Sequence, residues 1–157
     1  MTQELVRYLN MALFGGVAAA GFGILFNSPP RIIPNCFGAG ALVLIVRTAG
    51  LDLGLSLPVA SFLAALFLSV ADRTWLRVQS VRGSVIAVVG CIPMIPGSLA
   101  ARGLRSLFQL FHTTPDNGML PLTIALENLV IVLSTFAAIG TALAIPTLLF
   151  PRQPAED

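Results

Sequence analysis

The sequence predicts an all-α integral membrane protein, and two observations support this: the composition and the lengths of the apolar blocks. Of the 157 residues, 56% are hydrophobic and 10% are charged, whereas about a quarter of the residues in a soluble domain carry charge. A bilayer core of about 30 Å takes about 20 apolar residues per helix. The chain therefore has room for a helix bundle of about five membrane segments, a single transmembrane domain over residues 1–157, and no separate soluble domain.

The apolar blocks set the expected membrane segments, at about residues 5–26, 32–49, 55–71, 84–111 and 120–150. In the first block, Gly15, Ala19 and Gly23 recur every fourth residue and share one helix face. Small side chains at this spacing let a neighbouring helix approach closely, so we expect a packed seam there. Pro29 and Pro30 end the block, because proline cannot continue a helix interior.

The arginines predict an orientation. With five crossings, five of them share one side of the membrane, namely Arg31, Arg73, Arg77, Arg82 and Arg152. Arg7 and Arg47 lie on the other side, and Arg47 is close enough to the end of its segment to extend its side chain to the interface. Because cationic residues accumulate on the cytoplasmic side, the C-terminus is expected in the cytoplasm.

The fourth block is interrupted by the sequence Cys91-Ile92-Pro93-Met94-Ile95-Pro96-Gly97. Pro93 and Pro96 each lack an N–H and clash with the preceding turn, so we expect two half-helices joined by an unwound stretch. Free N–H groups near Gly97, Ser98 and Leu99 would then begin a helix inside the membrane and favour an anion. Transporters hold substrate carboxylates in this way. The alternative is a purely structural kink.

Charged side chains near the break extend this interpretation. Arg102 and Arg105 are three residues apart and project from one helix face. Together they could bind a carboxylate through charge-assisted hydrogen bonds. The alternative is that both reach the membrane interface. Glu127, followed by Asn128, lies inside the last apolar block and is a candidate proton-coupling site or a partner for Arg102. The alternative is a glutamate near the interface.

Several function classes lack support in the sequence. There is no Walker motif, no Ser/His/Asp set and no HExxH motif, and Cys36 and Cys91 have no metal-ligand neighbours. The net charge of +2 is too small to suggest a nucleic-acid partner. We therefore predict a transporter subunit rather than an enzyme, with no cofactor and no metal.

Two sequence runs, residues 21–31 and residues 92–97, resemble the threonine/serine exporter family. The chain length and the order of these motifs resemble the small subunit of its split members, whose substrates include succinate. The resemblance implies a bacterial inner-membrane exporter of small carboxylates or amino acids that needs a larger membrane subunit of the same family. Pro93, Pro96 and Gly97 match the family motif. The alternative function is a non-transporting accessory subunit that assembles or stabilises the larger chain.

Overall fold

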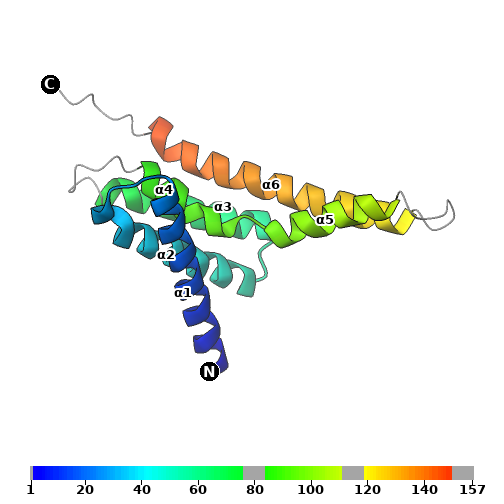
Figure 1. The fold of residues 1–157 in the computed structure, drawn as a ribbon, viewed down its shortest axis with the longest axis horizontal. Helices are drawn as coiled ribbons and strands as arrows, with labels where there is room; N and C mark the ends of the chain where they lie inside the picture. Colours follow the sequence, from blue (N-terminus) through cyan, green and yellow to red (C-terminus); the bar gives the residue numbers. More distant parts are fainter. Residues whose placement is uncertain (1, 76–83, 111–118, 150–157) are drawn as a thin grey trace.

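Figure 1 shows the computed structural model of the chain, which describes residues 2–75, 84–110 and 119–149 and contains helices but no strands in those ranges. The elements in chain order are α1 (Thr2–Leu25), η1 (Pro30–Ile32), α2 (Ile33–Asp52), α3 (Leu57–Trp75), α4 (Ser84–Cys91), η3 (Ile92–Met94), α5 (Gly97–Leu110) and α6 (Met119–Leu149). The predicted all-helical class and the broken fourth segment are confirmed.

Length and apolar composition identify the helices that can cross a membrane. Three stretches of the described chain qualify alone, namely Thr2–Leu25, Pro30–Asp52 and Pro121–Pro146. Val85–Met94 and Gly97–Leu110 qualify only as a pair, bent by 51°. The apolar part of α3, Leu57–Asp72, is shorter than the about 20 residues that a bilayer requires. The described residues thus give three to four candidate spans where about five segments were expected, and the difference lies in α3 and in whether the bent pair counts as one span.

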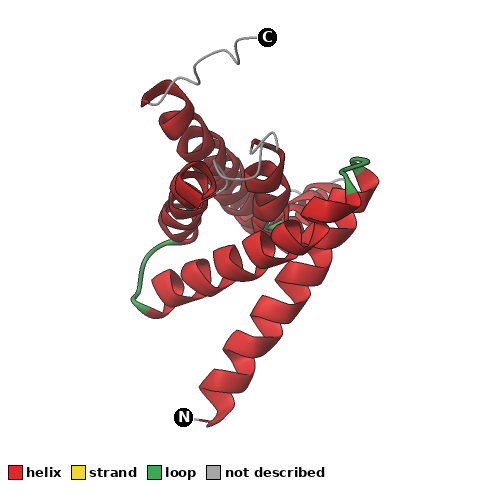
Figure 2. Ribbon diagram, turned by 90° about the vertical axis from the view of Figure 1, so that its left-hand side faces the viewer, coloured by secondary structure: helices red, strands yellow, loops and turns green. Residues whose placement is uncertain are grey.

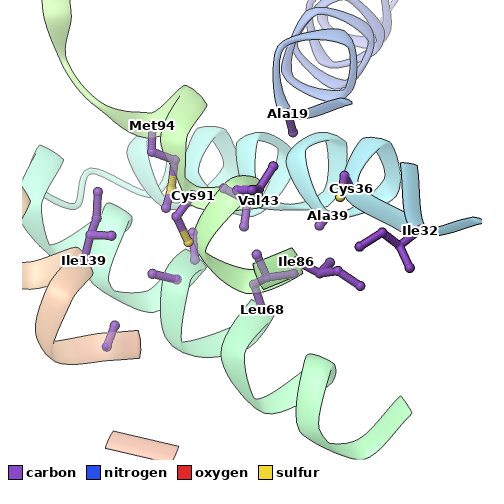
Figure 3. Close-up of a cluster of buried hydrophobic side chains, with 14 residues drawn as sticks. Ala19, Ile32, Cys36, Ala39, Val43, Leu68, Ile86, Cys91, Met94 and Ile139 are labelled. Atoms are coloured by element: carbon purple, nitrogen blue, oxygen red, sulfur yellow. The ribbon is translucent and has the colours of Figure 1, made fainter. Parts of the chain in front are cut away.

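Many large apolar side chains lie on the outside of the bundle, and half of the buried cluster is made of small residues. Phe14, Leu25 and Leu148 are 69%, 72% and 79% exposed. Five of the 14 residues in the buried cluster are alanine and two are cysteine, and the other seven are Ile, Val, Leu and Met (Figure 3). Helices in lipid associate through close backbone packing rather than by hiding large apolar groups from water. The fold therefore matches that of a multi-pass membrane protein.

The small-residue face of α1 forms the contact with α2, and the two helices are antiparallel. A Cβ atom on Gly15 would lie 2.8 Å from the Gly40 carbonyl oxygen, and one on Gly23 would lie 3.2 Å from Cys36 Sγ. Ala19, between these two glycines, is fully buried. The predicted seam at Gly15, Ala19 and Gly23 is therefore where α2 packs.

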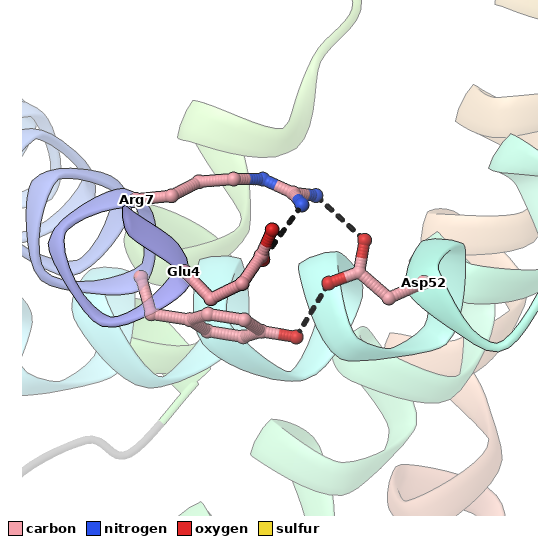
Figure 4. A network of polar contacts seen from close by, with 4 residues as sticks. Glu4, Arg7 and Asp52 are labelled. Carbon is pink, nitrogen blue, oxygen red and sulfur yellow. Dashed lines mark hydrogen bonds and ion pairs between the residues drawn. The ribbon is translucent and has the colours of Figure 1, made fainter. Parts of the chain in front are cut away.

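A polar network joins the beginning of α1 to the end of α2 (Figure 4). Arg7 Nη2 donates a hydrogen bond to Asp52 Oδ1 at 2.6 Å, and Tyr8 Oη donates to Asp52 Oδ2 at 2.7 Å. Arg7 Nη1 also donates to Glu4 Oε2 at 3.2 Å. Both carboxylate oxygens of Asp52 are thus engaged. Because these side chains are solvent-exposed, the network fixes the register of α1 on α2 more than it adds stability.

The position of α4 and α5 sets the geometry of the break. Helix α4 lies among α1, α2, α3 and α6, whereas α5 leaves this centre and runs along α6 (Figures 1 and 2). Gly103 permits the close approach of α5 to α6, since a Cβ there would lie 3.3 Å from Asn128 Cβ and 3.5 Å from the Ala125 carbonyl oxygen. The η3 turn packs against α1 and α2. The break therefore sits where the two parts of the bundle meet.

Candidate functional site at the helix break

The break consists of the η3 turn and an extended residue that precedes a proline. Ile95 has φ −61° and ψ 121°, the extended geometry to which the residue before Pro96 is restricted. Helix α5 begins directly after Pro96, whose lack of an N–H is harmless at a helix start. The local sequence is thus sufficient to explain why α4 and α5 are separate helices.

The start of α5 offers fewer free backbone donors than the sequence suggested. The Gly97 N–H donates to the Ile95 carbonyl oxygen at 2.8 Å, and the Leu99 N–H donates to the Pro96 carbonyl oxygen at 3.1 Å. Among the three predicted donors, only the Ser98 N–H has no hydrogen bond within the described chain. Gly97 and Ser98 are exposed, and a Cβ on Gly97 would meet no atom within 4 Å. The site is therefore open, with one backbone donor available.

The other predicted site residues lie on the outside of α5 and α6. Arg102 and Arg105 are both exposed on α5, whose buried residues are Gly103 and Ser106. Glu127 is exposed on α6, and it forms no ion pair with Arg102 in the described ranges. Asn128 Nδ2 donates to the Ile124 carbonyl oxygen at 2.7 Å, within its own helix. The structure places these residues on neighbouring helices without joining them, and their roles stay predictions.

One cation that the sequence assigned to the membrane interface is found at the break. Arg47 of α2 is half-buried, and its Nη1 donates to the Met94 carbonyl oxygen at 2.8 Å. In an unbroken helix that oxygen would accept the N–H of residue 98. The break frees the oxygen and Arg47 supplies the donor instead. The expectation that Arg47 extends to the interface is therefore corrected: its side chain turns inward, toward η3.

The described residues offer no obvious place for a metal ion. Within those ranges, no group of three or more His, Cys, Asp and Glu side chains comes close enough to hold one. The thiols of Cys36 and Cys91 are free and belong to the buried apolar cluster.

Comparisons with known proteins identify the family. A sequence profile described as threonine/serine exporter, ThrE, matches residues 11–149. The chain is 28% identical over 153 residues to an uncharacterized protein of Haemophilus influenzae. That match covers 98% of this chain and 51% of the relative, so the chain spans about half the relative's length. No solved structure matches the chain. Because the profile covers most of the chain, including both motifs from which the resemblance was drawn, the chain belongs to the threonine/serine exporter family.

Proposed function

We propose that this chain is a membrane subunit of a secondary exporter of small carboxylates or amino acids, of the succinate or threonine/serine class. The observation that carries the proposal is the helix break, where two half-helices are bent by 51°. Gly97 and Ser98 are exposed at the break, three and four residues after Met94, whose carbonyl oxygen accepts a hydrogen bond from Arg47. Broken helices that direct an N-terminus at a substrate carboxylate are a recurring device of transporters.

We also propose that a larger membrane subunit of the same family completes the transport path. The Haemophilus influenzae relative is about twice as long as this chain, which supports a path built from two units. Helix α5 supports it as well, because Leu104 and Phe108 are 53% and 60% exposed beside the exposed Arg102 and Arg105. An arginine within the membrane is costly unless it faces a wet cavity or a protein partner. These exposed side chains support α5 as the surface that would contact the larger subunit.

The remaining parts of the proposal concern location and coupling. We propose that the protein lies in the bacterial inner membrane with a cytoplasmic C-terminus, because the arginine distribution over five crossings favours that orientation. Arg77, Arg82 and Arg152, which contribute to that distribution, lie outside the described residues. Glu127, with Asn128 beside it, is proposed as the proton-coupling site, because a carboxylate on the outer face of a candidate membrane span requires a wet cavity or a protein partner.

Efflux measurements test the proposal. Cells that lack the native system would express this chain alone, the larger subunit alone, or both, and efflux of labelled succinate and threonine would be measured. We expect efflux only when both chains are present. Efflux from the larger subunit alone would assign this chain the accessory role instead. No efflux of either solute from any combination would contradict the proposed substrate class.

A further inference from the structure

We infer that Arg47 is the residue that binds the carboxylate of the solute at the break between α4 and α5. This inference deepens the proposed function and rests on it for the identity of the anion. It assigns the main role to a residue on α2, rather than to Arg102 or Arg105 on the outside of α5.

The hydrogen-bonding pattern of Arg47 leaves one edge of its guanidinium group free. Nη1 donates to the Met94 carbonyl oxygen at 2.8 Å, and this is the only hydrogen bond of the side chain among the described residues. Nε is buried and has no partner there. The remaining edge, formed by the Nε–H and an Nη2–H, is one that binds a carboxylate through two parallel hydrogen bonds. With Nη1 bonded to Met94, the Nε–H and Nη2–H edge has no hydrogen-bond partner, and its geometry suits a carboxylate.

The charge of Arg47 also lacks a counterion within the described chain. The ion pairs found there join Arg7 to Glu4 and to Asp52. Asp52 follows Arg47 on α2, but Arg7 and Tyr8 engage both of its carboxylate oxygens. Burying a cation that has an unsatisfied donor costs free energy. An anion that pairs with the charge and accepts the hydrogen bond offsets this cost. A solute carboxylate supplies both the charge and the acceptors.

The location of Arg47 relative to α5 favours the same ligand. Met94 lies three residues before Gly97, where α5 begins with an unpaired Ser98 N–H and an open approach. The dipole of α5 adds a partial positive charge at this end of the helix. Because Nε is enclosed in this structure, the anion reaches it when the half-helices move relative to α2. Such movement around a fixed site is how transporters alternate access.

Ligand-dependent stability tests the inference on the purified full chain, together with the larger subunit where the two co-purify. Succinate is expected to raise the thermal unfolding midpoint, because a ligand that binds the folded state stabilises it. Succinamide, which has a similar size and no charge, is expected to leave the midpoint unchanged. Arg47→Lys keeps a cation and a donor for Met94 but loses the fork, so succinate affinity should fall about 10- to 100-fold. Arg31→Lys, at an exposed position in η1, is the control and should bind succinate normally.

The outcomes separate this inference from the proposed function. Equal stabilisation by succinate and succinamide, no stabilisation by succinate, or normal affinity in Arg47→Lys overturns the role of Arg47. If Arg47→Lys fails to fold, succinate affinity is measured in Arg47→Gln instead. The unfolding midpoints of the wild-type protein with succinate and with succinamide then provide the second test. If the Arg47→Lys variant exports succinate at the wild-type rate, the inference about Arg47 is overturned and the proposed function stands. Arg47-dependent binding without any efflux supports the site and contradicts export.

Discussion

Gly40→Ala is expected to separate α1 from α2 and to remove most of the folded protein from the membrane. A Cβ atom at Gly40 would collide with Ala19 Cβ and with the carbonyl oxygen of Gly15. Main-chain atoms cannot move aside unless the helix moves with them. Overpacking a core costs about 1–3 kcal/mol and occasionally more, and a clash with the main chain places Gly40→Ala at the upper end of that range. The measurement is the thermal unfolding midpoint in detergent, together with the yield of monodisperse protein.

Gly38→Ala provides the matched control on the same helix. Gly38 is exposed, and a Cβ there would meet no atom within 4 Å. Alanine also favours a helix interior over glycine by about 1 kcal/mol, so Gly38→Ala should be neutral or stabilising. Equal unfolding midpoints for Gly40→Ala and Gly38→Ala would contradict the packing of α1 on α2 described above.

The double substitution Pro93→Ala with Pro96→Ala is expected to abolish most of the efflux without unfolding the protein. Both N–H groups return and both ring clashes disappear, so α4 and α5 can join into one straighter helix. The Met94 carbonyl oxygen then accepts the Ser98 N–H and turns along the axis of the straightened helix, which displaces it from Arg47. Misplacing a reacting or binding group by about 1 Å can lower a rate about 100-fold. We expect the rate of succinate efflux to fall by about that factor.

Two measurements distinguish a functional break from a structural kink. Spin labels at the exposed positions Val88 on α4 and Phe108 on α5 should move apart as the 51° bend opens. Pro34→Ala, at an exposed site in the first turn of α2, is the control and should change neither the distance nor the efflux. A straightened helix with full efflux would mean that the break is only a kink.

The helical elements and the break could be predicted because their causes are local. Apolar blocks and flanking prolines bring the expected helix ends close to the observed ones, as at Leu25 and Leu149. Pro93 and Pro96 restrict their immediate neighbours, so two half-helices follow from the sequence alone. The seam at Gly15 and Gly23 follows from their spacing on one helix face.

The contacts that define the candidate site were not predictable in the same way. Arg47 and Met94 are 47 residues apart, and only the packing of α2 against η3 brings them together. In sequence, Arg47 is indistinguishable from an arginine that extends to the interface. The local hydrogen bond from the Gly97 N–H was also missed, because it depends on how the chain turns at Ile95. Tertiary contacts and turn geometry, rather than residue patterns, decide both points.

The central claim, that solute binds at the break, is tested most directly by the accessibility of position 97. Gly97→Cys should fold, because the site has room for a side chain, and the native Cys36 and Cys91 are buried and should react slowly. A hydrophilic maleimide should label Gly97→Cys, and succinate should slow that reaction. Succinate should not affect labelling of Leu53→Cys, a position that is 81% exposed just after α2. Labelling at position 97 that succinate leaves unchanged, in an assembly that exports succinate, would contradict a solute path through the break.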